Sequence, residues 1–516
     1  MGRTVIWRAG LFLLAGALAA PAAEPQALEF RLQYLPVHGR RQDTLTYDFD
    51  GDGKGDLLNT SVDLDADPPS RRLAFHLQRE RAYREAPDHV CEVDPRAGAL
   101  VFGDFLPGGG VEAGFIAEDG VWVHPWGKDG PEESPLKIIH AATFFRSPSP
   151  RLLPVWQWAI DYDGDGRHDL VLPVRDGYRV YFQTAPGVFG RVAPLESELP
   201  AGVSRALAPS TYAERPEAAA AHVVASVDLP KLDSADINGD GLRDLVLIRK
   251  DTVTYFLQKE AGVFPSQRPW RVSYRVPTLE GEPQKDTVNY ATVRFTDLNR
   301  DGLADLVVTK VEGKLGFWDS IKTSVYLHLG TGRGNFVADR RIVIDGVSIE
   351  PEFIDMNLDG KLDVFTSRLR TDLIRQAVSA LVLGDIAISY EVFQFDPKEG
   401  GLLADPVFEK VIFVARRDLE KTGAGAVPLV FIRGDVSGDG RPDLIVVDPK
   451  GSELQIHPGR REETGRGPRI GFDGTAHWRV GMQRHPSGLQ VIDVDSDGRN
   501  DILLYHAGVL GVVLAR

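Results

Sequence analysis

One nine-residue pattern, D-x-[D/N/S]-x-D-G-x-x-D, recurs seven times and contains the residues best suited to hold a metal ion. Its first, third, fifth and ninth positions offer oxygen atoms, mostly from carboxylates, and its sixth position is always Gly. Closely spaced carboxylate, amide and carbonyl oxygens, without His or Cys, suit a hard cation with roughly six to eight oxygen ligands. The pattern therefore predicts calcium sites rather than magnesium or zinc sites.

Position seven of the pattern is Lys, Arg or Leu, so its backbone carbonyl is the expected ligand there and its side chain is not. The predicted ligands, which would hold about seven Ca²⁺ ions, are Asp48, Asp50, Asp52, Lys54 (backbone) and Asp56; Asp161, Asp163, Asp165, Arg167 (backbone) and Asp169; Asp236, Asn238, Asp240, Leu242 (backbone) and Asp244; Asp297, Asn299, Asp301, Leu303 (backbone) and Asp305; Asp355, Asn357, Asp359, Lys361 (backbone) and Asp363; Asp435, Ser437, Asp439, Arg441 (backbone) and Asp443; and Asp493, Asp495, Asp497, Arg499 (backbone) and Asp501.

The first six positions also match the loop of an EF-hand, and two features argue against that fold. An EF-hand loop ends in a bidentate Glu at position twelve and lies between helices. Here the closing acid is at position nine, and strand-forming runs such as Leu245–Ile248 and Leu444–Val447 follow. The remaining alternative, Asp- and Gly-rich turns that bind no metal, is disfavoured by seven complete copies of the pattern.

The spacing of the loops predicts the architecture. Between the first two complete loops, Asp104 opens a degenerate copy (DFLPGGGVE) that lacks oxygens at positions three and five and is expected to bind no metal. A strand leads into each loop, and a strand, a turn, a second strand, a Gly/Phe segment and a third strand follow. Four antiparallel strands in roughly 60 residues form one blade of a β-propeller. We expect an all-β propeller over residues 24–516 with eight blades, or seven if residues 90–145 form none.

The two ends of the chain also suit a closed ring. The last repeat stops after its third strand, Gly511–Ala515, and so lacks an outer strand. The N-terminal run Glu29–Leu35 precedes the first loop at the distance where outer strands occur in the other repeats. We expect it to complete the last blade and to remove an exposed sheet edge.

These loops and strands closely resemble the FG-GAP/VCBS repeats of integrin-α-like β-propellers, which carry calcium loops of this type between blade strands. The resemblance covers nearly all of residues 24–516. It implies a calcium-binding propeller and is consistent with a role in cell adhesion. It identifies the fold and the metal and leaves the substrate or ligand open.

Composition and the N-terminus indicate where the protein works. The 59 Lys and Arg against 74 Asp and Glu give a net charge of −15, which argues against a nucleic-acid partner. Arg3 and Arg8, the apolar run Ala9–Ala20 and small residues after it predict a cleaved signal peptide over residues 1–23. That run is too short to span a membrane, so we expect a secreted or periplasmic protein without a membrane span.

Two classes of function remain open. No HExxH or G-x-S-x-G motif is present, so we favour a binding or adhesion module for a glycan or an extracytoplasmic protein. The alternative is a polysaccharide-active, lyase-like enzyme, because some rhamnogalacturonan lyases resemble this architecture.

Two insertions and a pair of tryptophans are candidates for a partner surface. The insertions are residues 312–323, with Phe317 and Trp318, and residues 368–386, where Leu369, Leu373, Ala377 and Leu381 follow a helical spacing. Both are expected at the blade end opposite the metal loops, where a partner could bind or where they only extend a blade. Trp156 and Trp158 could form a sugar-stacking platform, although packing between blades is favoured.

Overall fold

The computed structural model describes most of the chain. The described residues are 28–145, 151–197, 201–206, 222–227, 229–249, 251–265, 270–276, 287–314, 321–332, 334–346, 348, 351–369, 385–396, 401–403, 405–415, 430–448, 451–464 and 467–516. The predicted signal peptide, residues 1–23, therefore lies outside them.

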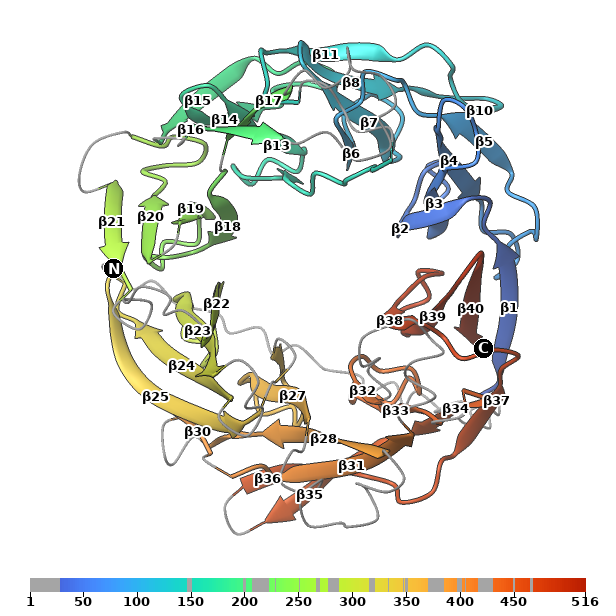
Figure 1. Cartoon of the computed structure of the whole chain (residues 1–516), viewed down its shortest axis with the longest axis vertical. Helices are drawn as coiled ribbons and strands as arrows, with labels where there is room; N and C mark the ends of the chain where they lie inside the picture. The colour runs from blue at the N-terminus through green and yellow to red at the C-terminus, as the bar shows by residue number, and fades with distance from the viewer. Residues whose placement is uncertain are drawn as a thin grey trace, which may run out of the picture.

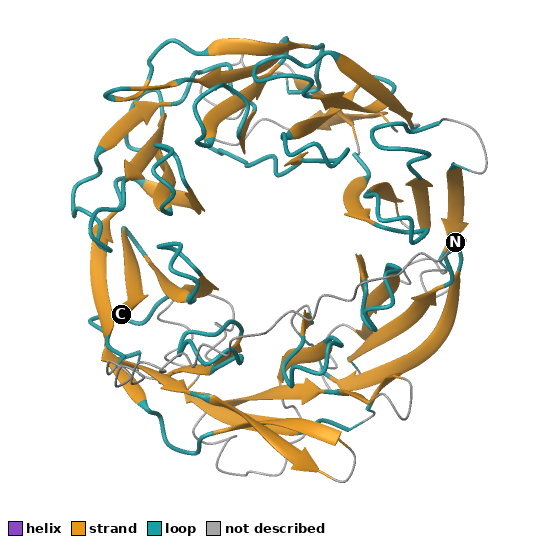
Figure 2. Ribbon diagram, turned by 180° about the vertical axis from the view of Figure 1, so that it is seen from behind, coloured by secondary structure: helices purple, strands orange, loops and turns teal. Residues whose placement is uncertain are grey.

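Four-stranded antiparallel sheets follow one another around a ring and form eight blades in the described part of the chain (Figure 1). Strands and loops make up these blades (Figure 2), and no described helix is long and apolar enough to cross a membrane. Blades 1 to 4 consist of β2 (Arg40–Tyr47), β3 (Asp56–Asp63), β4 (Ser70–His76) and β5 (His89–Glu92); β6 (Ala99–Gly103), β7 (Glu112–Ala117), β8 (Gly120–His124) and β11 (Leu136–His140); β12 (Ala159–Ile160), β13 (Asp169–Val174), β14 (Gly177–Phe182) and β15 (Arg191–Glu196); and β18 (Lys231–Ala235), β19 (Asp244–Arg249), β20 (Thr252–Phe256) and β21 (Arg271–Arg275).

The second half of the ring repeats this order. Blades 5 to 8 consist of β22 (Thr287–Thr296), β23 (Asp305–Lys314), β24 (Lys322–Gly330) and β25 (Phe336–Asp345); β26 (Glu352–Ile354), β27 (Asp363–Leu369), β28 (Asp385–Phe393) and β31 (Phe408–Ala415); β32 (Val430–Ile432), β33 (Leu444–Val447), β34 (Glu453–His457) and β37 (Trp478–Gly481); and β38 (Gly488–Ile492), β39 (Asp501–His506), β40 (Val509–Ala515) and β1 (Phe30–Pro36). The degenerate repeat forms blade 2, so the prediction of eight blades is confirmed and the alternative of seven is wrong.

The N-terminal strand closes the ring, as expected from the sequence. Strand β1 pairs antiparallel with β40, from Phe30 opposite Ala515 to Pro36 opposite Val509. Backbone hydrogen bonds between Glu29 and Arg516 extend this pairing in both directions, at 3.0 and 2.8 Å. The first and last segments of the chain thus share one blade and cover its outer edge.

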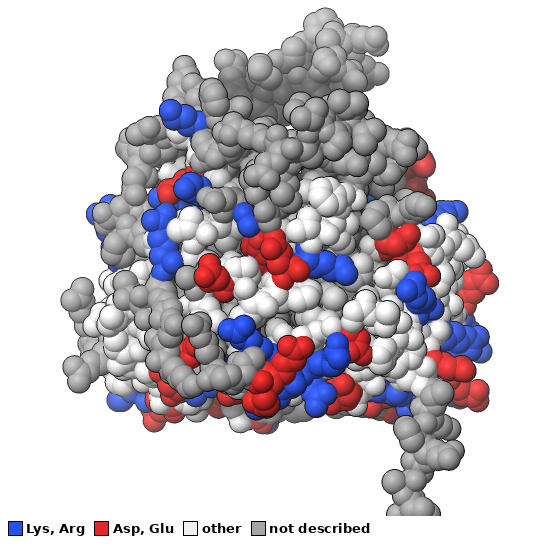
Figure 3. Space-filling view, turned by 90° about the horizontal axis from the view of Figure 1, so that it is seen from below, with Lys and Arg blue, Asp and Glu red and all other residues white. Residues whose placement is uncertain are grey.

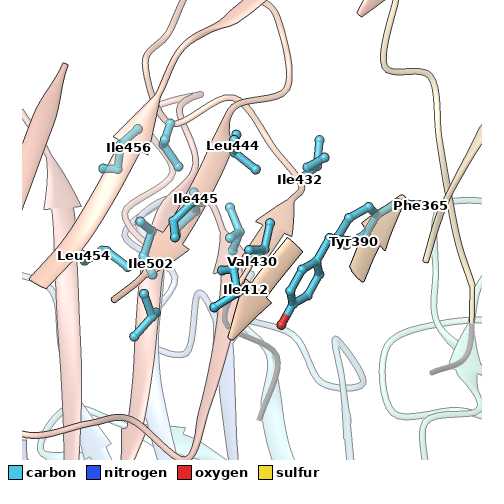
Figure 4. Packing of buried hydrophobic residues seen from close by; sticks show 14 of the residues in the cluster. Phe365, Tyr390, Ile412, Val430, Ile432, Leu444, Ile445, Leu454, Ile456 and Ile502 are labelled. Atoms are coloured by element: carbon cyan, nitrogen blue, oxygen red, sulfur yellow. The ribbon is translucent and has the colours of Figure 1, made fainter. Parts of the chain in front are cut away.

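The hydrophobic core lies between the blades. Each junction of neighbouring blades contains a buried apolar cluster, and the largest one joins blades 6, 7 and 8 through residues such as Tyr390, Ile445 and Ile502 (Figure 4). Trp156 and Trp158 are half-buried and pack against the clusters around blade 3, which supports packing rather than a sugar platform. Because every blade packs on two neighbours, closure of the ring buries apolar surface at both ends of the chain.

In the described part of the chain, four two-stranded hairpins are added to the blades. They are β9 (Trp126–Gly127) with β10 (Gly130–Pro131), β16 (Ala201–Ala206) with β17 (His222–Val227), β29 (Phe395–Asp396) with β30 (Gly401–Leu402), and β35 (Gly459–Thr464) with β36 (Gly467–Phe472). Basic and acidic side chains are interspersed on the side of the molecule shown in Figure 3.

The two predicted insertions join the second and third strands of blades 5 and 6. Successive connections of an antiparallel blade alternate between its two ends, so the strand ends that flank these insertions lie at the end opposite the loops before the second strands. Residues 315–320 and 370–384, with Phe317, Trp318 and the expected helical segment, lie outside the described residues.

Candidate metal centre

Every predicted metal loop joins the first strand of a blade to the second. In blade 1 the loop begins at Asp48, directly after β2, and its closing acid Asp56 is the first residue of β3. The same connection holds the loops of blades 3 to 8. All seven complete loops therefore lie at one end of the propeller, because this connection always falls at the same end of an antiparallel blade.

The carboxylate at position one shapes each loop. In blade 1, Asp48 Oδ1 accepts hydrogen bonds from the backbone N–H groups of Gly51 and Asp52 at 2.8 and 3.1 Å, and Oδ2 accepts one from Gly53 at 2.8 Å. The bonds from positions five and six recur in all seven loops, at 3.0–3.2 and 2.6–3.0 Å. This wrapping of the backbone around one acid requires the tight turn that Gly53 allows, with φ of 80°.

Position four also has a left-handed backbone, which the sequence pattern did not indicate. Four loops have Gly there, but Arg300, Leu358 and Ser496 adopt φ of 55–58° in the other three. A non-Gly residue in this region is uncommon. The loop conformation is therefore imposed by the hydrogen bonds to position one as well as by glycine.

Three of the loops bring acidic oxygens close together. Groups of three carboxylates have ligand atoms within 4.8 Å of one another. They are Asp48, Asp50 and Asp56; Asp161, Asp163 and Asp169; and Asp493, Asp495 and Asp497. Position three of the other four loops is Asn or Ser, which replaces one acid by a neutral oxygen. This all-oxygen donor set fits a hard divalent cation, so these clusters can hold a metal ion.

The closing acid at position nine has a second task that the sequence did not reveal. Asp56 Oδ2 accepts a hydrogen bond from the N–H of Phe49 at 3.0 Å, and Oδ1 accepts one from the N–H of Gln78, just beyond the third strand, at 2.9 Å. The same two bonds occur in every complete loop, at 2.9–3.1 Å and 2.8–3.1 Å. The acid thus ties its loop to the end of the third strand.

Burial perturbs these closing acids. It raises the pKa of Asp56, Asp305 and Asp443 to about 6 and that of Asp169, Asp244, Asp363 and Asp501 to about 7. Backbone hydrogen bonds lower the pKa in each case, and neighbouring loop acids raise it. A bound cation would favour the charged form and reverse the rise.

The side chain at position seven pairs with the acid at position five in several loops. Lys54 contacts Asp52, and Arg499 Nη2 donates to Asp497 Oδ2 at 2.9 Å. Lys361 instead donates to the carbonyl of Asn299 in the preceding blade, at 3.0 Å. These cations offset part of the negative charge of the loops, which agrees with a side chain that is not itself a ligand.

Hydrogen bonds connect neighbouring loops around the ring. The N–H of Val111 donates to the carbonyl of Asp48 at 2.8 Å, and that of Ala304 donates to the carbonyl of Asp236 at 2.8 Å. Leu362 and Leu298 are linked in the same way, as are Asn500 and Asp435. At four of the junctions the loop of one blade is therefore bonded to the loop of the next.

Comparisons with known proteins identify the repeats. The sequence matches the family model of the FG-GAP-like repeat over residues 236–308 and 297–366. Matches among solved structures include an Agrocybe aegerita lectin described for specific recognition of non-reducing terminal N-acetylglucosamine, with 15% identity, coverage of 85% of this chain and 91% of that chain, and a TM-score of 0.37. Hsv2 of Kluyveromyces lactis has 12% identity, coverage of 85% and 99%, and a TM-score of 0.30. BBS1N in complex with ARL6DN has 11% identity, coverage of 69% and 90%, and a TM-score of 0.27.

No curated protein matches the sequence. The family match covers the loops that begin at Asp236, Asp297 and Asp355, and the same loop geometry recurs in blades outside the matched residues. With eight four-stranded blades in one closed ring, the chain is a β-propeller, and its residues 236–366 match the FG-GAP-like repeat.

Proposed function

We propose that the protein is a calcium-stabilised binding module that works outside the cytoplasm and recognises a glycan or a protein partner. The observation that supports it best is the uniform geometry of the seven loops. Each presents oxygens at positions one, three, five and nine, and each is held by the same hydrogen bonds. Export rests on the predicted signal peptide over residues 1–23.

Calcium is the proposed metal because of the donors and the form of the loops. The clustered donors are carboxylate, amide and hydroxyl oxygens, which calcium accepts in irregular arrangements, whereas magnesium demands a nearly octahedral one. The seven loops contain 24 carboxylates: four in each of the loops at Asp48, Asp161 and Asp493, and three in each of the other four. Without a cation these acids repel one another within each loop.

The proposed role of calcium is structural. If each site has a dissociation constant of about 0.1 mM, as in many extracellular modules, millimolar calcium stabilises the fold by on the order of 1–2 kcal/mol per site. Several such sites together would equal the net stability of a typical domain, which is about 5–15 kcal/mol. Because the closing acids also hold the third strands, loss of calcium would loosen the blades as well as the loops.

Thermal unfolding tests this role. The melting temperature should be many degrees higher in about 1 mM calcium than in excess chelator, and magnesium at the same concentration should restore little of the loss. A melting temperature that does not change on chelation would refute the structural role.

A glycan-array screen of the calcium-loaded protein tests the binding function. Retention of a defined set of glycans, lost in chelator, is the expected result. Cleavage of a polysaccharide by the loaded protein would instead show an enzyme.

A further inference from the structure

A cavity of about 280 Å³ opens between the metal loop of blade 1 and the degenerate loop of blade 2. Phe49 and Asp50 of the first loop form one side, and Leu106 and Glu112 of the second form another. Trp126 at the start of hairpin β9–β10 and Leu136 at the start of β11 complete it. Its volume lies just below the range of about 300–1,000 Å³ for small-molecule sites, which fits a ligand of a single ring.

Glu112 gives this cavity a buried acceptor. It is the closing acid of the degenerate loop and is only 5% exposed. Its Oε2 accepts hydrogen bonds from the N–H groups of Phe105 and Leu106 at 2.7 and 3.2 Å. No other residue in the described part of the chain donates to its Oε1, whereas the corresponding oxygen in the other seven blades is bonded to the end of the third strand.

The hairpin β9–β10 explains this difference. The register of blade 2 shows which residue corresponds to Gln78 of blade 1. In blade 1, Leu57 follows the closing acid and pairs with His76, two residues before Gln78. In blade 2, Ala113 follows Glu112 and pairs with His124, so Trp126 is in the position that corresponds to Gln78. In blade 2 the chain turns away there, through Pro125, and Trp126 pairs with Pro131 instead. Blade 2 therefore leaves a carboxylate oxygen available at a position where the other blades use it for their own structure.

Trp126 provides a fixed donor and an apolar surface. Its ring is held by Phe49 (centroids 6.3 Å apart, stacked), Phe75 (5.4 Å, edge to face) and His89 (5.6 Å, edge to face). Its Nε1–H donates to no acceptor among the described residues, and the side chain is only half-buried. An oriented indole next to free polar groups is a common feature of ligand sites.

Glycines let the degenerate loop of blade 2 approach the metal loop of blade 1 closely. A Cβ on Gly110 would lie 2.8 Å from the carbonyl oxygen of Phe49, and one on Gly51 would lie 2.9 Å from that of Gly109. Side chains at these positions could not be accommodated without movement of the backbone. The glycines thus allow the two loops to approach each other closely.

The lining determines the chemistry of the ligand. Asp50 and Glu112 offer acceptor oxygens, and the charge of Asp50 repels an anion, while calcium bound in the neighbouring Asp48 loop would repel a cation. Trp126, Leu106 and the half-exposed Leu136 offer surface to an apolar face. A neutral ring with hydroxyl donors on its edge and C–H groups on its face meets all of these conditions.

We propose that this cavity binds one neutral sugar unit of a glycan, with its hydroxyl groups on Glu112 and Asp50 and its apolar face against Trp126. The proposal rests on the proposed function and specifies its ligand class and location. Trp126 and Glu112 are the residues that set specificity, because blade 2 alone among the eight combines a closing acid that is not bonded to the third strand with an indole beside it.

The test is titration of the calcium-loaded full-length protein with glucose, galactose, mannose and N-acetylglucosamine, followed by calorimetry or ligand-observed NMR. Glucuronate and methylammonium serve as the anionic and cationic probes. At least one neutral sugar should bind, and Glu112→Gln and Trp126→Phe should each weaken binding about tenfold, because each removes one polar contact. Trp122→Phe, which removes an indole N–H in the same blade outside the cavity, should leave binding unchanged.

A variant at the edge of the cavity and a count of bound calcium ions distinguish failure of the cavity proposal from failure of the calcium proposal. Leu136→Arg, at a side chain that is 51% exposed, should preserve folding and block the entrance. If no neutral sugar binds while the protein still holds about seven calcium ions, the cavity proposal is overturned and the calcium proposal stands. Sugar binding that survives all three cavity variants, or selective binding of methylammonium, would likewise overturn it.

Discussion

Asp56 and Gln78 are joined by a 2.9 Å hydrogen bond from the Gln78 N–H to the Asp56 Oδ1, which connects the first metal loop to the third strand of its blade across 22 residues of sequence. The same acid also accepts the N–H of Phe49 at the base of the loop. One carboxylate therefore serves the proposed metal site and the blade, and the two functions can be separated by experiment.

We expect Asp244→Asn to destabilise the protein even without calcium. Both oxygens of Asp244 accept backbone hydrogen bonds, from Ile237 and Gln258, and the side chain is fully buried. In Asn an NH2 group replaces one of the two acceptor oxygens, so one of the two backbone N–H groups loses its partner. The free energy of unfolding should therefore fall by about 1–3 kcal/mol in chelator.

Asp240→Asn, at the exposed position five of the same loop, is the matched control. This substitution should lower the free energy of unfolding only slightly in chelator and more strongly in calcium. Denaturant titrations under the two conditions measure both changes. Equal losses for the two variants in chelator would contradict the second role of the closing acid.

The metal-free protein should lose stability as the pH rises from about 4 to about 7. Burial raises the pKa of the closing acids to about 6 or about 7, from a value near 3.8 when unfolded. Between these values the folded state binds more protons than the unfolded state, so the free energy of unfolding falls with pH.

In calcium, the contribution of the closing acids to the free energy of unfolding should instead rise with pH, because the ion favours the charged acids. Calcium affinity should weaken below pH 7, because protons then compete with the ion. Melting temperatures measured at pH 5 and pH 8, with chelator and with calcium, test both statements. A metal-free protein that melts higher at pH 8 than at pH 5 would contradict the first.

Removal of residues 24–36 should open the ring. The truncation deletes β1, whose Leu35 is buried between blades 8 and 1, and exposes the edge of β40. We expect aggregation or a large drop in melting temperature, measured by light scattering and calorimetry. Deletion of residues 24–27 alone, which leaves β1 intact, should be tolerated; equal stability of both truncations would mean that β1 does not secure the ring.

The number of blades and their closure could be predicted because they follow from features with strong local signals. The D-x-[D/N/S]-x-D-G-x-x-D pattern marks the turn before each second strand, and the last repeat lacks an outer strand, which the run Glu29–Leu35 is expected to supply. The ends of the strands have weaker signals in the sequence. Strand β40 begins at Val509, two residues before the predicted start, because the left-handed turn at Gly508 directly precedes it.

The second role of the closing acid could not be predicted, because its partner is a backbone N–H that any residue can supply. Gln78, Gly330 and Ala515 are the donors in three different blades, and these residue types share no side-chain signal. The cavity beside Glu112 was missed for a related reason. It arises where Pro125 and Trp126 depart from the course that the chain takes after the third strand in the other blades. Only the three-dimensional arrangement shows that the hydrogen bond from this segment to the closing acid is then absent.

Metal analysis of the purified protein tests the central claim most directly. After exhaustive dialysis into calcium-free buffer, reloading with calcium and removal of the excess, the protein should contain about seven calcium ions per chain, one for each complete loop. The Asp236→Ala variant should contain one fewer, because that carboxylate shapes its loop and is a proposed ligand. Two or fewer ions per chain, or a count that the Asp236→Ala variant does not change, would contradict the account.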